Sequence, residues 1–123
     1  MPNQIQSFKK EKIFDLGERT ARFGEDIIVF LKEIKLTPIN ESIIRQLIRC
    51  ATSVGANYME ADGGESKRDF IHKIGICKKE SKESMYWLRI LAKAEPNYAE
   101  QCRVLWKEVH ELALIFSAIV KRK

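Results

Sequence analysis

The stretch that decides the fold is SKRDFIHKIGICKKESKESMYWLRILAKA, residues 66–94, because it carries two parallel stripes at helical spacing. The first stripe is apolar or small and recurs at alternating steps of four and three residues: Phe70, Ile74, Cys77, Ser81, Ser84, Leu88 and Leu91. The second, which we call the basic stripe, lies two residues earlier and comprises Arg68, His72, Gly75, Lys79, Lys82, Tyr86, Arg89 and Lys93. A helix in a bundle needs the first stripe for packing. It does not need the second, which therefore calls for another explanation.

Three further segments share this alternation, and the sequence predicts four helices over residues 15–35, 40–62, 66–94 and 96–121. A spacing that alternates between three and four residues favours shallow, left-handed helix packing. The connections are short, so consecutive helices should run antiparallel. The predicted fold is all-α, an antiparallel up-down-up-down left-handed four-helix bundle, built from a single domain over residues 13–121. Residues 1–12 are polar and are expected to form a flexible N-terminal segment.

Breaking and capping signals predict where these helices end. Pro38 disfavours helix in the residue before it and should stop the first helix. Asn40 is of a type that caps a helix start, and the glycine pair at 63–64 should end the second helix in a left-handed turn. Ser66 should cap the third helix, and Pro96 suits the first turn of the fourth.

The charge of the chain is distributed unevenly. The formal net charge of the 123 residues is +5, yet residues 1–62 are neutral, with nine basic and nine acidic side chains. Residues 66–94 alone hold eight basic and three acidic side chains. This asymmetry indicates an anionic partner, the alternative being a lysine-rich face that only solubilises the helix.

The cysteines and the apolar runs indicate the cellular compartment of the protein. Cys50, Cys77 and Cys102 lie on or beside apolar stripes without a Cys-x-x-Cys spacing, which is typical of core thiols in a reducing compartment. The N-terminus has no signal-peptide pattern, and the apolar runs are far shorter than the roughly 20 residues that span a bilayer. We expect a cytoplasmic protein with no membrane partner.

No group of residues in the sequence supports catalysis. His72 and His110 are the only histidines, and no Gly-x-Ser-x-Gly elbow occurs. A dinuclear metal site in a bundle needs Glu-x-x-His pairs, but Asp69 stands before His72 and Lys107 before His110. There is no clustered zinc-ligand set and no glycine-rich phosphate loop. We therefore expect no enzyme activity, no cofactor and no metal.

The basic stripe is the functional candidate that remains. Its spacing lets several cations meet successive phosphates, and an aromatic ring among them can stack on unpaired bases. The candidate nucleic-acid-binding residues are Arg68, Lys79, Lys82, Tyr86, Arg89 and Lys93. Neighbouring Glu80 and Glu83 leave local neutralisation open as an alternative.

Several helices carry more apolar side chains than one stripe requires. These are Ile28, Leu31, Ile76, Trp87, Ile90, Trp106, Ala113 and Val120. Exposed apolar bands mark association, so we expect a homo-oligomer.

The middle of the chain resembles a known family. The run IRCATSVGANYMEA at residues 48–61, followed by SKRDFIHKIGICKKE at residues 66–80, is similar to the four-helix bundle proteins encoded within intervening sequences of bacterial 23S ribosomal RNA genes. The resemblance covers about residues 14–120. Many members carry Ser-Ile-Pro-Ser-Asn where this chain has Ser-Val-Gly-Ala-Asn at residues 53–57. Gly55 thus replaces a proline, which argues against a proline kink but still permits a bend.

The resemblance implies a homopentamer without catalytic activity. A related branch comprises accessory proteins of diversity-generating retroelements, which implies a role with RNA or DNA and with a nucleic-acid-processing protein, a reverse transcriptase. The recurrent polar positions of the family correspond here to Arg49, Ser53, Asn57, Glu60, Ser66 and Lys67. We interpret them as structural, with Asn57 and Glu60 holding the helix end and the turn through hydrogen bonds. The alternative function is a structural or protein-protein interaction module with no nucleic-acid role.

Overall fold

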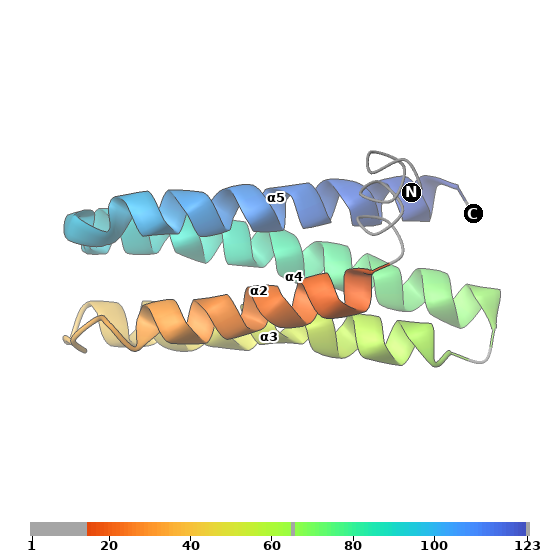
Figure 1. Ribbon diagram of the computed structural model, residues 1–123, viewed down its shortest axis with the longest axis horizontal. Helices are drawn as coiled ribbons and strands as arrows, with labels where there is room; N and C mark the ends of the chain where they lie inside the picture. Colours follow the sequence, from red (N-terminus) through yellow and green to blue (C-terminus); the bar gives the residue numbers. More distant parts are fainter. Residues whose placement is uncertain (1–14, 65, 123) are drawn as a thin grey trace, which may run out of the picture.

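The computed structural model describes residues 15–64 and 66–122, in which all regular structure is helical. The helices are α2 (Leu16–Leu31), α3 (Asn40–Asp62), α4 (Lys67–Ala94) and α5 (Ala99–Lys121), and a short 3-10 turn, η1 (Pro96–Tyr98), precedes α5. Figure 1 shows the four helices side by side along the long axis, with the α2–α3 connection and the α4–α5 corner at the same end. The prediction of an all-α, four-helix fold is confirmed. The flexible segment expected at residues 1–12, and residues 13 and 14 of the expected domain, lie outside the described residues.

The core is built from the predicted stripes. The fully buried side chains include Phe23 of α2, Leu47 of α3, Leu88 of α4 and Phe116 of α5, so each helix contributes to one interior. Helix α4 packs extensively on both α3 and α5, whereas α2 and α5 touch much less. The long segment that predicted the fold is thus the helix on which the bundle depends most.

The first helix ends earlier than expected. Helix α2 stops at Leu31 instead of residue 35, because its last turn tightens. The amide N–H groups of Glu33 and Ile34 donate to carbonyls three residues back, those of Phe30 and Leu31, at 3.1 Å each. Ile34 stays buried all the same, so the apolar stripe continues beyond the helix.

The start of α3 corrects the expected role of Asn40. Asn40 is not the cap, because Thr37 precedes it in a reciprocal pair typical of a capping box. The hydroxyl of Thr37 accepts from the Asn40 amide at 3.1 Å, and Asn40 Oδ1 accepts from the Thr37 amide at 2.8 Å. The Asn40 side chain is completely buried, and its Nδ2 donates to the Lys35 carbonyl at 2.9 Å and to Glu95 Oε2 at 3.0 Å. One amide therefore ties the α2–α3 connection to the α4–α5 corner.

The glycine pair after α3 does not adopt the left-handed conformation that we expected. Neither Gly63 nor Gly64 has a positive φ, and Gly63 lies at φ −92°, ψ 8°. Gly64 is needed for space instead, because a Cβ there would come within 3.0 Å of the Ala61 carbonyl oxygen. The other end of this connection follows the prediction, since Ser66 Oγ accepts from the Asp69 amide at 3.1 Å and caps α4.

Helices α2 and α3 approach closely at Gly55. Helix α3 runs through Gly55 from Asn40 to Asp62 without a break. A Cβ on Gly55 would lie 3.4 Å from the backbone of Thr20, so the glycine marks the place where the two helices pack tightly.

An ion pair that the sequence did not indicate joins α2 to α5. Arg19 Nε and Nη2 each donate to the Glu108 carboxylate at 2.9 Å, and Nη2 lies 3.2 Å from Glu111 Oε1. Hydrogen bonding to Glu108 is the main reason why the pKa of Arg19 is raised, against the opposing effect of burial. This polar bridge strengthens the least extensive of the main helix interfaces.

The surplus apolar residues are only partly exposed. Leu31 and Ala113, which we expected to be available for association, are buried within the chain. Ile28 is exposed, and so are Val29, Val104 and Leu114, which the sequence did not single out. Within residues 15–64 and 66–122, no helix is both long and apolar enough to cross a membrane.

Candidate nucleic-acid interface

The six candidate residues of the basic stripe all lie exposed on α4. At 100° per residue they fall within an arc of about 80°, on the face opposite the buried residues of this helix. None of the five cations among them forms an ion pair with another residue of the described chain. The structure therefore places these charges in solvent, clear of the packing surfaces.

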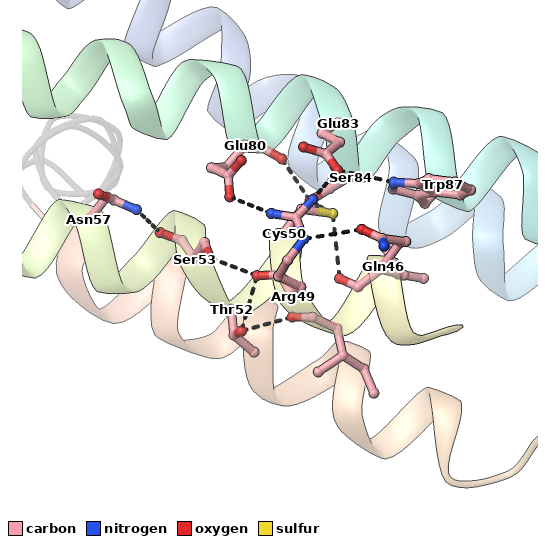
Figure 2. Close-up of polar contacts among 12 residues, drawn as sticks. Gln46, Arg49, Cys50, Thr52, Ser53, Asn57, Glu80, Glu83, Ser84 and Trp87 are labelled. Carbon is pink, nitrogen blue, oxygen red and sulfur yellow. Dashed lines mark hydrogen bonds and ion pairs between the residues drawn. The ribbon is translucent and has the colours of Figure 1, made fainter. Parts of the chain in front are cut away.

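The neighbouring acids do not neutralise the stripe. Glu80 and Glu83 both turn toward α3, where the guanidinium of Arg49 lies between them (Figure 2). Arg49 Nη1 lies 3.3 Å from Glu80 Oε2, and Nη2 bonds to Glu83. Glu83 also accepts from Trp87 Nε1 at 3.2 Å. Lys79 and Lys82 are thus left without the local partners that the sequence allowed them.

The stripe is not continuous along α4. Its full length is about 37 Å at 1.5 Å per residue, but Arg68 is separated from Lys79 by about 16 Å. Between them stand His72 and Gly75, and a Cβ on Gly75 would meet nothing within 4 Å. The cations from Lys79 to Lys93 form one group, and Arg68 belongs to the other end of the helix. That end of α4 lies at the same end of the bundle as the C-terminus of α5, where Lys121 and Arg122 are exposed (Figure 1).

Tyr86 is the aromatic residue of the larger group. The residue is 53% exposed, and its ring stands edge-on to Trp87, with the ring centroids 5.0 Å apart and the planes at 76°. The contact with Trp87 holds the ring at the surface, so a base can stack on it without displacing a core residue.

The polar positions of α3 serve the helix and its contacts with α4. Ser53 Oγ donates to the Arg49 carbonyl at 2.7 Å, and Asn57 Nδ2 donates to the Ser53 carbonyl at 2.8 Å, as Figure 2 shows. Glu60 Oε1 accepts from Lys73 Nζ of α4 at 2.6 Å. Lys67 is exposed at the start of α4. We call the set of Arg49, Glu60, Lys73, Glu80 and Glu83 the α3–α4 seam.

The three cysteines are buried thiols. Burial raises the pKa of Cys77 to about 12 and the pKa values of Cys50 and Cys102 to about 11, so these thiols stay protonated near neutral pH. In the described part of the chain, no three side chains of His, Cys, Asp or Glu gather where they could hold a metal ion.

Comparison with known proteins identifies the family. The model of the 23S rRNA-intervening sequence protein family matches residues 14–118. This chain belongs to that family. A protein of unknown function from the S23 ribosomal protein family of Bacteroides thetaiotaomicron, solved as a crystal structure, is 30% identical in sequence. The match covers 85% of this chain and 97% of that one, with a TM-score of 0.74. No curated protein matches the chain.

The structure adds residues to the candidate interface that the sequence did not indicate. Arg103, Trp106 and Lys107 of α5 line a groove whose opposite side is formed by α4, including Arg89 of the basic stripe. A signal for this neighbourhood was present, because Arg89 and Arg103 each stand seven residues from Pro96. The corner between α4 and α5, which begins with Pro96, folds α5 back along α4 (Figure 1). Arg89 and Arg103, equidistant from Pro96, therefore line the same groove.

Proposed function

We propose that this family member is a non-catalytic, oligomeric four-helix bundle protein that binds RNA or DNA through the basic stripe of α4. The observation that supports the proposal is that five stripe cations are exposed without an ion pair in the described chain, while Glu80 and Glu83 pair with Arg49. Cations of this kind bind phosphates and release counterions, which supplies most of the affinity for a nucleic acid.

The assembly that we propose is a homopentamer of antiparallel, up-down-up-down, left-handed bundles, each a single domain over residues 13–121. Val29, Val104 and Leu114 are each more than half exposed, which supports association between chains. A ring multiplies the net charge of +5 per chain, so weak single contacts act together. Light scattering should give about five times the chain mass of 14.3 kDa, and the mass of one chain would contradict the assembly.

The setting that we propose is the bacterial cytoplasm, with a nucleic-acid-processing protein as the further partner and no membrane partner. Three buried thiols, all raised in pKa, suit a reducing compartment.

A charge-reversal experiment tests the surface. The variant K79E, K82E and R89E should lose binding to a mixed RNA and DNA pool while its mass by light scattering stays unchanged. The matched control R22E, K32E and R45E makes the same change in net charge on exposed positions of α2, its end and α3, and it should keep most of the binding. In the parent, binding should weaken steeply with salt, by a log-log slope of about 0.7 to 0.9 per phosphate contact.

Each failure has its own meaning. Unchanged binding in the α4 variant would refute the surface, and equal losses in both variants would show that only net charge matters. No binding by the parent would refute the function and favour the alternative, a structural or protein-protein interaction module, for which the exposed Val29, Val104 and Leu114 supply an apolar surface.

A further inference from the structure

A groove between α4 and α5 lies next to the basic stripe. Its volume is about 480 Å³, within the range of small-ligand sites. Its floor is apolar and comes from both helices: Leu88 and Ala92 of α4, and Cys102 of α5. Leu88 and Cys102 are buried members of the core, so this floor is fixed by the packing of the bundle.

The rim of the groove is cationic. Arg89 of α4 lines it together with Arg103 and Lys107 of α5, and none of the lining residues is acidic. Arg89 and Lys107 form no ion pair within residues 15–64 and 66–122. Arg103 pairs with Glu100 of its own helix at 2.6 Å, but both side chains are well exposed, and such a pair is readily exchanged for another anion. The charge at the rim fits a polyanion.

An aromatic ring completes the groove. Trp106 lines it, and the indole stacks on His110 with the ring centroids 4.8 Å apart and the planes at 28°. This stacking holds the indole in one orientation. Trp106 Nε1 donates no hydrogen bond to any described residue, so it is available to a ligand. An apolar floor, an oriented indole and three cations at the rim together suit a flat, heteroaromatic group attached to phosphate.

We propose that the α4–α5 groove binds an unpaired nucleobase, and that the nucleic acid bound by this protein is therefore single-stranded. The inference rests on the proposed function, because Arg89 belongs to both the basic stripe and the groove. A strand that follows the stripe passes the groove at Arg89, where a base can enter against Trp106 while Arg103 and Lys107 contact its phosphates. Bases inside a duplex are stacked on both faces and cannot enter such a groove.

Two probes of equal charge separate the groove from the stripe. One is a twelve-nucleotide oligothymidylate, and the other is an abasic strand with the same number of phosphates. The parent should bind the oligothymidylate about tenfold more tightly, because stacking adds to phosphate contacts. W106L should lose most of this preference and keep only the part that stacking on Tyr86 contributes. W106F, which keeps a ring, should retain most of the preference.

The variants also separate the charges from the ring. R103Q and K107Q should weaken both probes alike and lower the salt slope by about 0.7 each, because they remove phosphate contacts only. Circular dichroism and thermal unfolding check that each variant is folded. If W106L is not folded, W106F serves as the test variant. W106F should then keep the preference for the oligothymidylate, and a duplex hairpin of the same charge should bind no better than the abasic strand.

The outcomes distinguish this inference from the proposed function. Equal binding of the two probes by the parent would overturn the base site and leave the basic stripe intact. No binding of either probe would overturn the proposed function itself. A change in assembly mass on W106L would show that the groove holds a second copy of the chain, which would also overturn the base site.

Discussion

The α3–α4 seam and the α4–α5 groove hold their cationic side chains in different ways. At the seam, Arg49 reaches the carboxylates of Glu80 and Glu83 on the facing helix, and Lys73 reaches that of Glu60. Across the groove, no ion pair joins α4 to α5 among the described residues, and the only partner of a rim cation is Glu100 on the same helix. The residue types are alike on both sides of α4. Whether a carboxylate faces the cation decides whether it holds helices together or stays available to a ligand.

The thiols follow the same division. At the seam side, Ser84 Oγ donates to Cys50 Sγ at 3.3 Å, and Cys77 Sγ donates to the Val54 carbonyl at 3.5 Å. Cys102 instead belongs to the floor of the groove. Burial raises the pKa of all three from about 9, to about 11 for Cys50 and Cys102 and to about 12 for Cys77.

The largest effect that we predict is a loss of stability in alkali. The folded chain disfavours the thiolate, so the stabilisation is complete below pH 9 and is lost as the pH rises toward 11 to 12. Between pH 8 and pH 10, the free energy of unfolding should fall by about 1 kcal/mol per thiol, or about 3 kcal/mol in all. Urea unfolding at the two pH values measures it.

Cysteine variants assign this loss to the two sides of α4. Replacing both Cys50 and Cys77 with Ala should remove about two thirds of the pH-dependent loss, and C102A about one third. Because each variant is compared with itself at two pH values, the cost of the missing sulfur cancels. A parent whose stability is the same at pH 8 and pH 10 would show that the thiols are not shielded.

A smaller effect is expected at the corner that sets the groove. N40A removes the amide that bonds to Lys35, Thr37 and Glu95, and leaves two backbone groups of the connection without these partners. The free energy of unfolding should fall by about 2 kcal/mol. N97A is the control, because Asn97 is exposed in the same corner and should change stability by less than about 0.5 kcal/mol. Equal effects would mean that the corner is not held by Asn40.

Much of this architecture was readable from the sequence, because packing stripes depend on spacing alone. The stripe from Leu16 to Ile34 and the α4 stripe from Ile74 to Leu91 are buried where the spacing predicted, and Phe70 at the start of the α4 stripe is partly buried. The bond from Asn40 to Glu95 joins positions 55 apart, which no local pattern contains. The end of α2, the pairing of Asn40 with Thr37 and the tight contact at Gly64 are local, but they depend on backbone geometry that the spacing of apolar residues does not determine.

The candidate interface was readable only in part, for the same reason. The exposure of the basic stripe followed from the period of α4, since its residues stand opposite the core. The sequence did not show which acids would neutralise the basic stripe. Glu80 and Glu83 have Lys neighbours in the sequence, but they pair with Arg49, which is more than thirty positions away. From the sequence, Trp106 was only a surplus apolar residue. Its place in the groove depends on how α5 lies against α4.

The smallest change, and the most direct test of the comparison, replaces one arginine on each side of α4. R49M leaves the largely buried Glu80 without a cation, and should lower the free energy of unfolding by about 1 to 2 kcal/mol, since Arg49 is itself half exposed. R103M removes only an exposed pair within one helix, so it should cost less than about 0.5 kcal/mol.

In nucleic-acid binding the order of the two variants should reverse. R103M should reduce the salt slope by about 0.7, the contribution of one phosphate contact on a single strand, while R49M should leave the slope as in the parent. The arginine on α3 would then matter more for the free energy of unfolding, and the arginine on α5 would matter more for nucleic-acid binding. If the same variant had the greater effect in both measurements, the comparison would fail. A carboxylate on the facing helix would then not determine whether a cation stabilises the bundle or binds a ligand.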